Sequence, residues 1–362
     1  MNTTLLGLGV AVPEHTLTQQ QALELARVYC GDAHNPRALD VLYRGTRIQN
    51  RYSVVTETAA VGKVPFFPSP VDAADRGPST AQRMQRYEEE VVPLAVGACR
   101  TALADAKVDP GAITHVIVVT CTGFFAPGLD IALIKTLNLR PNIQRLQVGF
   151  MGCHGALNGL QAARDILNAN ASACVLLCAA ELCSLHMQYG HQDGSAVANA
   201  LFADGAAAAI LGRGAETAST LGSIANVGSL LVPNSDDAMS WRIGDHGFEM
   251  TLSSRIPDLI ETHVPLWMEN WLGSAGLRVA EIASWAAHPG GPRILDAVEK
   301  SLGLPRPMLK SSREILADHG NMSSPTVLFI LERLRQTIGN VPLPCVMLGF
   351  GPGLTIEAVL LK

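Results

Sequence analysis

Three polar residues, each close to glycine or proline, are candidates for acyl-transfer chemistry. Cys153 lies in FMGCHGALNGL, His288 in WAAHPGGPRIL and Asn321 in HGNMSSPTVLFIL. A cysteine thiolate is a strong nucleophile, an imidazole moves protons, and a neutral amide donates hydrogen bonds to a developing oxyanion. Together these side chains supply what the transfer of an acyl group requires.

Each candidate also has an ordinary structural interpretation. Helical spacing begins just after Cys153, and a thiol at a helix N-terminus faces unpaired N–H groups that lower its pKa, whereas the alternative is a buried structural cysteine. The flanking Gly152 and Gly155 are expected to leave room for a substrate. His288 lies at the end of a strand, before a glycine-rich turn. This context favours a histidine that faces a cleft over a histidine buried in the core. Asn321 taken alone is better explained as a helix N-cap.

Two further motifs point to chemistry less strongly. The glycines of GFGPGLT, residues 349–355, suggest a dinucleotide-binding loop, but a strand pattern follows where that loop needs a helix. We therefore expect a tight loop that brings backbone close to a substrate, and no nicotinamide cofactor. Cys183, His186 and His191 lack a fourth ligand at a standard spacing, so no metal site is expected.

Short apolar runs alternate with helical patterns, which predicts an α/β fold with buried sheets. Strands are predicted at Leu5–Val12, His115–Cys121, 173–182, 201–212 and Ser284–His288, and in two segments near the C-terminus. Helices are predicted at 81–106, Leu129–Leu139 and Pro292–Leu304.

The order of these elements repeats within the chain. Residues 115–139 run strand, Pro-Gly turn, helix, and residues 282–304 repeat that order about 170 residues later. Cys153 and Asn321 each stand just before a helix in the segments that follow. We therefore predict two related halves, 1–215 with the cysteine and 216–362 with the histidine and asparagine, whose seam brings the three residues together.

Composition narrows the function further. The chain has 362 residues, 48 % hydrophobic and 16 % charged, with a net charge of −5, so a large buried core is expected and nucleic acid is not an expected partner. No apolar stretch approaches the roughly 20 residues that span a bilayer. The N-terminus lacks basic residues before its apolar run, which predicts a cytoplasmic protein with mostly reduced thiols.

Taken together, FMGCHGA, AAHPGGPRILD, HGNMSSPTVLFIL and GFGPGLT resemble the motifs of type III polyketide synthases, the chalcone and stilbene synthase superfamily, in the same order. LFADGAAAAILG, residues 201–212, matches another shared segment. The resemblance implies a thiolase-like, five-layered αβαβα fold, a homodimer, and a catalytic triad of Cys153, His288 and Asn321. It also implies that malonyl-coenzyme A is condensed onto an acyl-coenzyme A starter through an acyl–cysteine, without a metal or redox cofactor. The polyketide would then cyclise to a pyrone or to a resorcinol- or phloroglucinol-type product.

The same resemblance implies which residues contact the substrate. Phe202 matches a gatekeeping phenylalanine of the family, and Leu252 stands at the second gatekeeper. Residues 120–130 and 181–186 are most similar to bacterial alkylpyrone and alkylresorcinol synthases, so an aliphatic starter is expected in a channel beside Cys121, Ala126 and His186. The full set of expected substrate contacts is Phe202, Cys121, His186, Leu252, Ala126 and Ser323.

The coenzyme A phosphates need cations at the mouth of the site. Expected contacts are Arg44, Arg47, Arg51 and Arg293, with the backbone of Gly290 and Gly291. For each arginine the alternative is an ordinary solvated surface charge.

Three other functions stay open at this level. In a papain-like cysteine hydrolase the catalytic Cys, His and Asn follow one another along the chain in the same order, but such an enzyme carries a C-G-S-C-W segment that is missing here. A ketoacyl synthase III-like enzyme that primes fatty acid synthesis shares the fold, but Asn321 and GFGPG favour the polyketide branch. A non-catalytic dimeric binding protein would leave the triad unexplained.

Overall fold

The computed structural model describes residues 3–30, 36–55, 65–190, 195–214 and 221–362. In these ranges nine strands form one mixed sheet in the order β11-β12-β13-β8-β1-β7-β6-β4-β5. The strands are β1 (Thr3–Ala11), β4 (His115–Thr120), β5 (Gln144–Gly149), β6 (Cys174–Leu182), β7 (Asp204–Arg213), β8 (Ser223–Leu231), β11 (Ser284–Ala287), β12 (Cys345–Gly351) and β13 (Thr355–Leu361).

The pairing pattern repeats between the two ends of this sheet. β4 runs parallel to β6, which pairs antiparallel with β7, which pairs antiparallel with β1. Likewise β11 runs parallel to β12, which pairs antiparallel with β13, which pairs antiparallel with β8. The strands β4–β6–β7–β1 form one group and β11–β12–β13–β8 the other, and two antiparallel residue pairs between β1 and β8 join the two groups. The repeated order of elements in the sequence therefore corresponds to a repeated strand arrangement.

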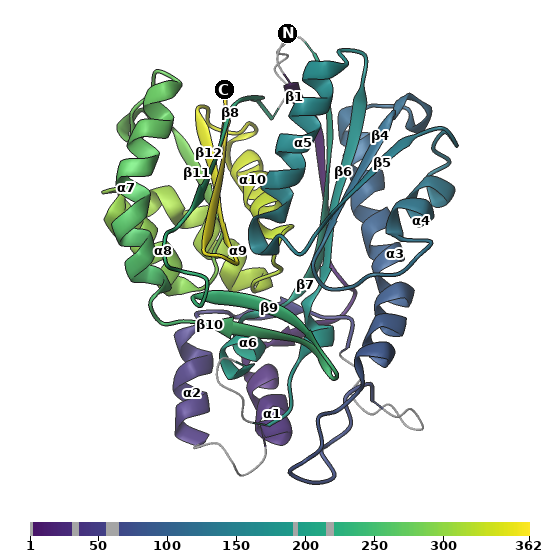
Figure 1. Cartoon of the computed structure of the whole chain (residues 1–362), viewed down its shortest axis with the longest axis vertical. Helices are drawn as coiled ribbons and strands as arrows, with labels where there is room; N and C mark the ends of the chain where they lie inside the picture. Colours follow the sequence, from purple (N-terminus) through teal and green to yellow (C-terminus); the bar gives the residue numbers. More distant parts are fainter. Residues whose placement is uncertain (1–2, 31–35, 56–64, 191–194, 215–220) are drawn as a thin grey trace.

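Helices complete five layers (Figure 1). α5 (Gly155–Ala169) and α10 (Thr326–Ile338) lie between the two strand groups and contact both. α3 (Thr80–Ala106) and α4 (Leu129–Thr136) cover one outer face, and α7 (Ile256–Ser274) and α8 (Pro292–Ser301) cover the other. This is the layered arrangement that the sequence predicts.

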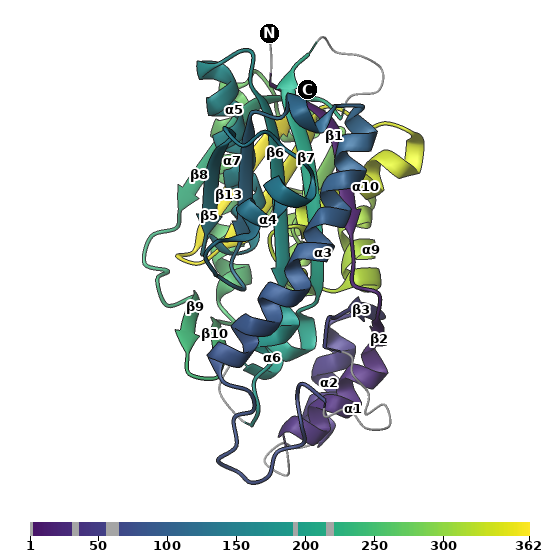
Figure 2. The ribbon, with the colours of Figure 1, turned by 90° about the vertical axis from the view of Figure 1, so that its right-hand side faces the viewer.

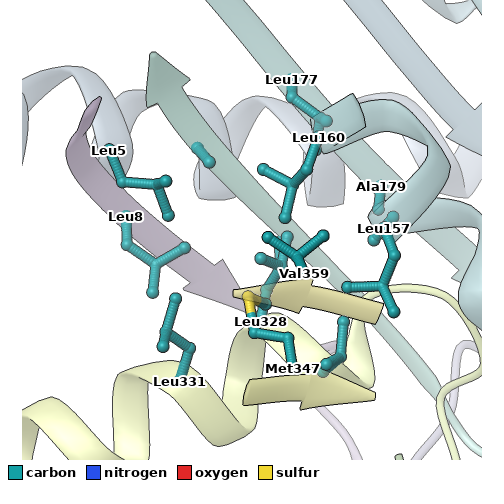
Figure 3. Close-up of a cluster of buried hydrophobic side chains, with 14 of the residues drawn as sticks. Leu5, Leu8, Leu157, Leu160, Leu177, Ala179, Leu328, Leu331, Met347 and Val359 are labelled. Carbon is teal, nitrogen blue, oxygen red and sulfur yellow. The ribbon is translucent and has the colours of Figure 1, made fainter. Parts of the chain in front are cut away.

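The inner helices are held by an apolar core (Figure 3). Leu157 and Leu160 of α5 meet Leu328 and Leu331 of α10, and all four side chains are at most 1 % exposed. Side chains of β1, β6, β12 and β13 fill the space around them. Burial of a leucine side chain contributes about 1.5–3 kcal/mol, so this core fixes the positions of both inner helices.

Smaller elements gather at the end of the molecule opposite the C-terminus (Figures 1 and 2). They are α1 (Gln19–Cys30), α2 (Pro36–Gly45), α6 (Ser195–Leu201), the pair β2 (Thr16–Thr18) and β3 (Asn50–Tyr52), and the hairpin β9 (Met239–Gly244) and β10 (Gly247–Leu252). The helix α9 (Lys310–His319) packs against α10 and also contacts β3. None of the helices in the described ranges has the length and apolarity to cross a membrane.

The predicted elements agree with the structure to within a few residues. The helix predicted at 81–106 begins at Thr80 because Ser79 caps it, accepting from the Gln82 N–H while the Gln82 side chain bonds back. The strand predicted at 201–212 begins only at Asp204, since Ser195–Leu201 forms α6. The expected boundary between the halves, 215/216, lies outside the described residues.

Candidate active site

The turn that carries Cys153 is built by close contacts with the rest of the protein. Gly152–His154 forms one 3₁₀ turn between β5 and α5. Gly152 has φ +76°, and a Cβ there would lie 2.4 Å from Cδ of Pro352. A Cβ at Gly155 would lie 2.8 Å from Cγ1 of Val119. The expectation that these glycines leave room for a substrate was therefore wrong, because protein atoms fill both spaces.

The GFGPG segment closes over this turn as a β-hairpin. β12 ends at Gly351 and β13 begins at Thr355, so strands flank the loop as expected. The ring of His154 packs against Gly351, where a Cβ would lie 2.4 Å from Nε2. Its Nδ1 and Nε2 lie 2.6 Å from Asn158 Oδ1 and Thr355 Oγ1. The hairpin and the nucleophile turn are thereby held together, which fixes the position of Cys153.

Asn321 presents its amide nitrogen to the thiol. Its Oδ1 accepts from the Ser323 N–H at 2.8 Å, so the nitrogen is the part of the amide that remains to donate, and the side chain is close enough to Cys153 to act against the rise of its pKa. The backbone of Asn321 bridges to the other half, donating to Leu201 O and accepting from the Ala203 N–H, both at 2.9 Å. Because α10 begins only at Thr326, Asn321 is not its N-cap.

His288 follows β11 and enters the same space. Its backbone N–H donates to Leu348 O at 2.8 Å, which continues the pairing of β11 with β12. The side chain is 1 % exposed, and neither ring nitrogen has a hydrogen-bond partner among the described residues. A buried imidazole without a partner is costly unless a ligand supplies one. Cys153, His288 and Asn321 line a single cavity, so the structure brings together the three residues that the sequence singled out.

Burial controls the protonation of the pair. It raises the pKa of the Cys153 thiol to about 11 and lowers the pKa of the His288 imidazole to about 3. Hydrogen bonds from Ser323 and Asn321 act in the opposite direction on the thiol but are smaller. The helix N-terminus therefore does not lower the pKa of the isolated thiol as expected, because desolvation outweighs it. The neutral thiol and neutral imidazole are the ground state.

The other residues expected to contact the substrate line different cavities. Phe202 lines the cavity of Cys153 and the two cavities next to it. Leu252 lines the same cavity on the side of the surface groove. Cys121 and Ser323 line a small cavity that also contains Cys153. His186 lies deeper, in the wall of a separate chamber, where its Nε2 lies 2.7 Å from Thr122 O and its Nδ1 accepts from the Phe248 N–H at 2.9 Å.

Ala126 lines neither the catalytic cavity nor the two cavities that continue from it toward His186. It is exposed, in the loop between β4 and α4. Of the three residues expected along the channel, Cys121 and His186 line adjoining cavities, whereas Ala126 lies outside both. An aromatic cluster of Phe124, Phe150, Phe248, His186 and Trp241 lies at this end of the site.

Sequence reasoning missed the β9–β10 hairpin, which forms one wall of the site. Met239, Trp241 and Met250 all line cavities with Cys153, and Trp241 Nε1 donates to Cys121 O at 2.8 Å. The available signal was the segment GDHG, residues 244–247, since glycines around a two-residue turn are typical of hairpins.

The expected coenzyme A contacts divide into two groups. Gly290, Gly291 and Arg293 line an open groove of about 410 Å³ at the surface, opposite the end of α2. Arg44 and Arg47, at that end of α2, are exposed. Arg51 contradicts its expected role, because it is only 5 % exposed. Its terminal nitrogens donate to backbone carbonyls of residues 199, 200 and 202, so it stabilises the interior and does not face the groove.

No group of three or more metal-binding side chains occurs among the described residues. His191, the third member of the weak metal motif, lies outside them.

Comparison with known proteins covers both halves of the chain. Residues 1–215 match the family described as chalcone and stilbene synthases, N-terminal domain, and residues 224–362 match its C-terminal domain. The chain is 31 % identical over 362 residues to the alpha-pyrone synthesis polyketide synthase-like Pks18 of Mycobacterium tuberculosis, covering 98 % of this chain and 89 % of that protein. It is also 31 % identical to type III polyketide synthase A of Arabidopsis thaliana, over 99 % of this chain and 92 % of that protein.

Solved structures agree in fold. PKS-I from the brown alga Ectocarpus siliculosus matches with a TM-score of 0.92 at 30 % identity, over 100 % of this chain and 98 % of that one. The C-terminal type III polyketide synthase domain of Steely1 from Dictyostelium matches with a TM-score of 0.90 at 28 % identity, over 100 % of this chain and 99 % of that one. The expected thiolase-like α/β fold is thereby confirmed.

Proposed function

Because the chain belongs to the chalcone and stilbene synthase family of type III polyketide synthases, which are condensing acyltransferases, we propose that it extends an aliphatic acyl-coenzyme A with malonyl-coenzyme A and releases a pyrone-type product. The observation that carries the proposal is the single buried cavity shared by Cys153, His288 and Asn321. The relative named for alpha-pyrone synthesis supports the type of product.

The first step loads the starter onto Cys153. Proton transfer from the thiol to His288 creates a thiolate and an imidazolium together, so the buried cavity keeps its net charge although each ion alone is disfavoured there. The thiolate sulfur bonds to the thioester carbon of the starter, and the bond to the coenzyme A sulfur breaks. The departing coenzyme A takes the proton from His288.

The second step forms the carbon–carbon bond. Malonyl-coenzyme A loses carbon dioxide, and the electron pair of the broken bond becomes an enolate. The Asn321 amide nitrogen and a ring N–H of His288, which has no protein partner among the described residues, donate to the enolate oxygen. The enolate carbon bonds to the acyl carbon and the Cys153 thiolate departs. Repetition lengthens the chain before it cyclises, and these steps use no redox cofactor.

The surface groove is proposed to hold coenzyme A. It adjoins the catalytic cavity, with which it shares Leu201, Leu252, Ile256, Gly290 and Ile294. Arg293 lies in its wall, and the exposed Arg44 and Arg47 are close in the chain to its α2 residues, which supports recognition of phosphate there.

A homodimer is proposed to form along the edge of the sheet. β5 is the terminal strand, and its residues 144–147 are exposed. Leu146 and the nearby Phe124 and Met151 are large apolar side chains that are 36–41 % exposed. An exposed edge strand with apolar side chains is a surface that proteins usually cover.

Intact-protein mass spectrometry tests the loading step. Incubation with lauroyl-coenzyme A should add one lauroyl group to the native protein and none to Cys153→Ser, and addition of malonyl-coenzyme A should release a pyrone. Retention of acylation in Cys153→Ser, or no acylation of the native protein by any acyl-coenzyme A, would refute the proposal.

A further inference from the structure

The cavities of the protein form a series that continues beyond the catalytic residues. The surface groove adjoins the catalytic cavity, and this cavity adjoins the small cavity of Cys121, since they share Cys153, Phe202, Met239 and Met250. The small cavity in turn adjoins a larger space, with which it shares Cys183, Phe202, Trp241 and Met250. We call this larger space the α1 chamber, because Ala22, Leu25, Ala26 and Tyr29 of helix α1 form one of its walls.

The lining of the α1 chamber is apolar. Phe67 and Met187, which pack against Leu25 and Tyr29 of α1, line it as well, together with Trp241 and Phe248. The stacked rings of Tyr29 and Tyr189, whose centroids are 5.1 Å apart, support the α1 side, and the Tyr29 hydroxyl donates to Phe67 O. The chamber therefore presents mostly hydrocarbon to an occupant.

Most polar groups in the wall are already bonded to the protein, and Nε of Arg51 is the exception among the wall residues named here, a buried donor without a partner in the described part of the chain. Both terminal nitrogens of Arg51 donate to backbone carbonyls, and both ring nitrogens of His186 have backbone partners. The Gln188 amide nitrogen lies near three carbonyls, and the Asn199 amide bonds the backbone of Gln188. Burial also lowers the pKa of His186 to about 3, so it carries no charge. A ligand rich in carbonyl groups would leave its acceptors unpaired here, whereas a hydrocarbon chain would not.

Helix α1 leaves space at two positions. Ala22 and Ala26 are separated by one helical turn, so they share a face, and both line the chamber while only 8 % and 5 % exposed. Both residues also pack in one cluster with Leu39, Tyr43 and Ala200, so a larger side chain at either position would fill chamber space and press on α2 and α6. Trp241 stands at the passage from the small cavity, held by its hydrogen bond to Cys121 O at 2.8 Å.

From this geometry we propose that the α1 chamber binds the aliphatic tail of the starter acyl group, and that Ala22 and Ala26 determine the chain length that the enzyme accepts. This inference rests on the proposed function, since it requires an acyl group on Cys153. The tail passes Phe202 and Trp241 into the chamber and does not follow the route beside Ala126 that the sequence suggested.

The test is a chain-length profile of Ala26→Phe. The ratio of kcat/KM for lauroyl- to butyryl-coenzyme A should be high in the native protein, because each buried methylene adds up to roughly fourfold in binding. Ala26→Phe should reduce that ratio at least tenfold. The matched control is Val28→Phe on the same helix, whose side chain is 46 % exposed and outside the chamber, and it should keep the native ratio. Ala26→Leu, a smaller enlargement, replaces Ala26→Phe if the latter does not fold.

The outcomes separate this inference from the proposed function. Failure of every acyl-coenzyme A to acylate the native protein would remove both. Native acylation with an unchanged chain-length ratio in folded Ala26→Phe and Ala26→Leu would overturn the α1 chamber alone. An unchanged ratio with fewer malonyl units in the product, measured by mass spectrometry, would likewise overturn it and assign the chamber to the growing polyketide.

Discussion

Asn321→Asp tests whether the amide beside Cys153 stabilises negative charge. The aspartate can still accept from the Ser323 N–H, so the substitution replaces only the donating nitrogen by oxygen. Loss of one oxyanion donor typically costs roughly 10²–10³ in rate. A carboxylate about 4 Å from the enolate oxygen adds repulsion of about 4 kcal/mol at an effective dielectric constant near 20, or roughly another thousandfold. Protonation of the buried acid relieves part of this, so we expect a loss between roughly 10² and 10⁵.

The assay is the decarboxylation of malonyl-coenzyme A to acetyl-coenzyme A, and the product is measured over time by mass spectrometry. Only purified variants whose thermal stability equals that of the native protein are compared. Asn226→Asp is the matched control. Asn226 also accepts from a backbone N–H, of Val227 at 3.0 Å, and donates to Trp271 O, but it lies on β8 and lines none of the cavities described above. It should keep the native rate within about twofold, as distant surface changes usually do. A native decarboxylation rate in Asn321→Asp would refute the electrostatic role of the amide.

Three further substitutions address the nucleophile and its surroundings. Cys153→Ala should abolish polyketide formation while malonyl decarboxylation persists, because only condensation needs the acyl–cysteine, and product formation at the native level would disprove the assignment. Gly152→Ala should lower the free energy of unfolding by at least about 1–2 kcal/mol in urea, since φ is +76° and the new Cβ would clash with Pro352, whereas native stability would contradict the described turn. Burial raises the pKa of Glu181 from 4.5 to about 7, so the folded state binds its proton more tightly than the unfolded state. Native stability should therefore fall by up to about 3 kcal/mol as pH rises from 4.5 to 7, relative to Glu181→Gln, and parallel pH profiles of unfolding would contradict this.

The positions of Cys153 and His288 could be predicted because both follow local rules. Cys153 lies in a glycine-containing turn just before a helix, and His288 directly follows a strand before such a turn. Patterns of this kind are visible in a short window of sequence. The repeated order of elements then predicted that two halves would bring them together. The α/β class follows from the alternation of strands and helices, whereas the five layers were implied by the resemblance to type III polyketide synthases.

The protonation state could not be predicted in the same way. A helix N-terminus is visible in the sequence, whereas the desolvation that opposes it depends on everything packed around the thiol. Likewise, a glycine at position 152 suggests a turn, but only the structure shows that Pro352, about 200 positions later, occupies the space beside it.

Arg51 shows why long-range burial misleads sequence reasoning. Its neighbours Arg44 and Arg47 are exposed, and nothing local distinguishes them from it. Arg51 is buried because α6 turns the carbonyls of residues 199, 200 and 202 toward its guanidinium. The β9–β10 hairpin was missed although its strands, MSWRIG and GFEMTL, alternate apolar and polar residues as strands typically do. What the sequence does not show is that these short strands cover the catalytic cysteine.

The backbone bridge between Asn321 and residues 201–203 has a consequence for engineering. Because the two hydrogen bonds of the Asn321 backbone go to the residues on either side of Phe202, a substitution that moves the backbone at 202 also moves the residue whose amide stabilises the enolate. Selectivity and turnover would then change together, and a library at that position would select mainly against loss of rate. Helix α1 has no such link to the amide among the hydrogen bonds described, so diversification at Ala22 and Ala26 offers a way to vary the accepted acyl group while the catalytic geometry stays constant.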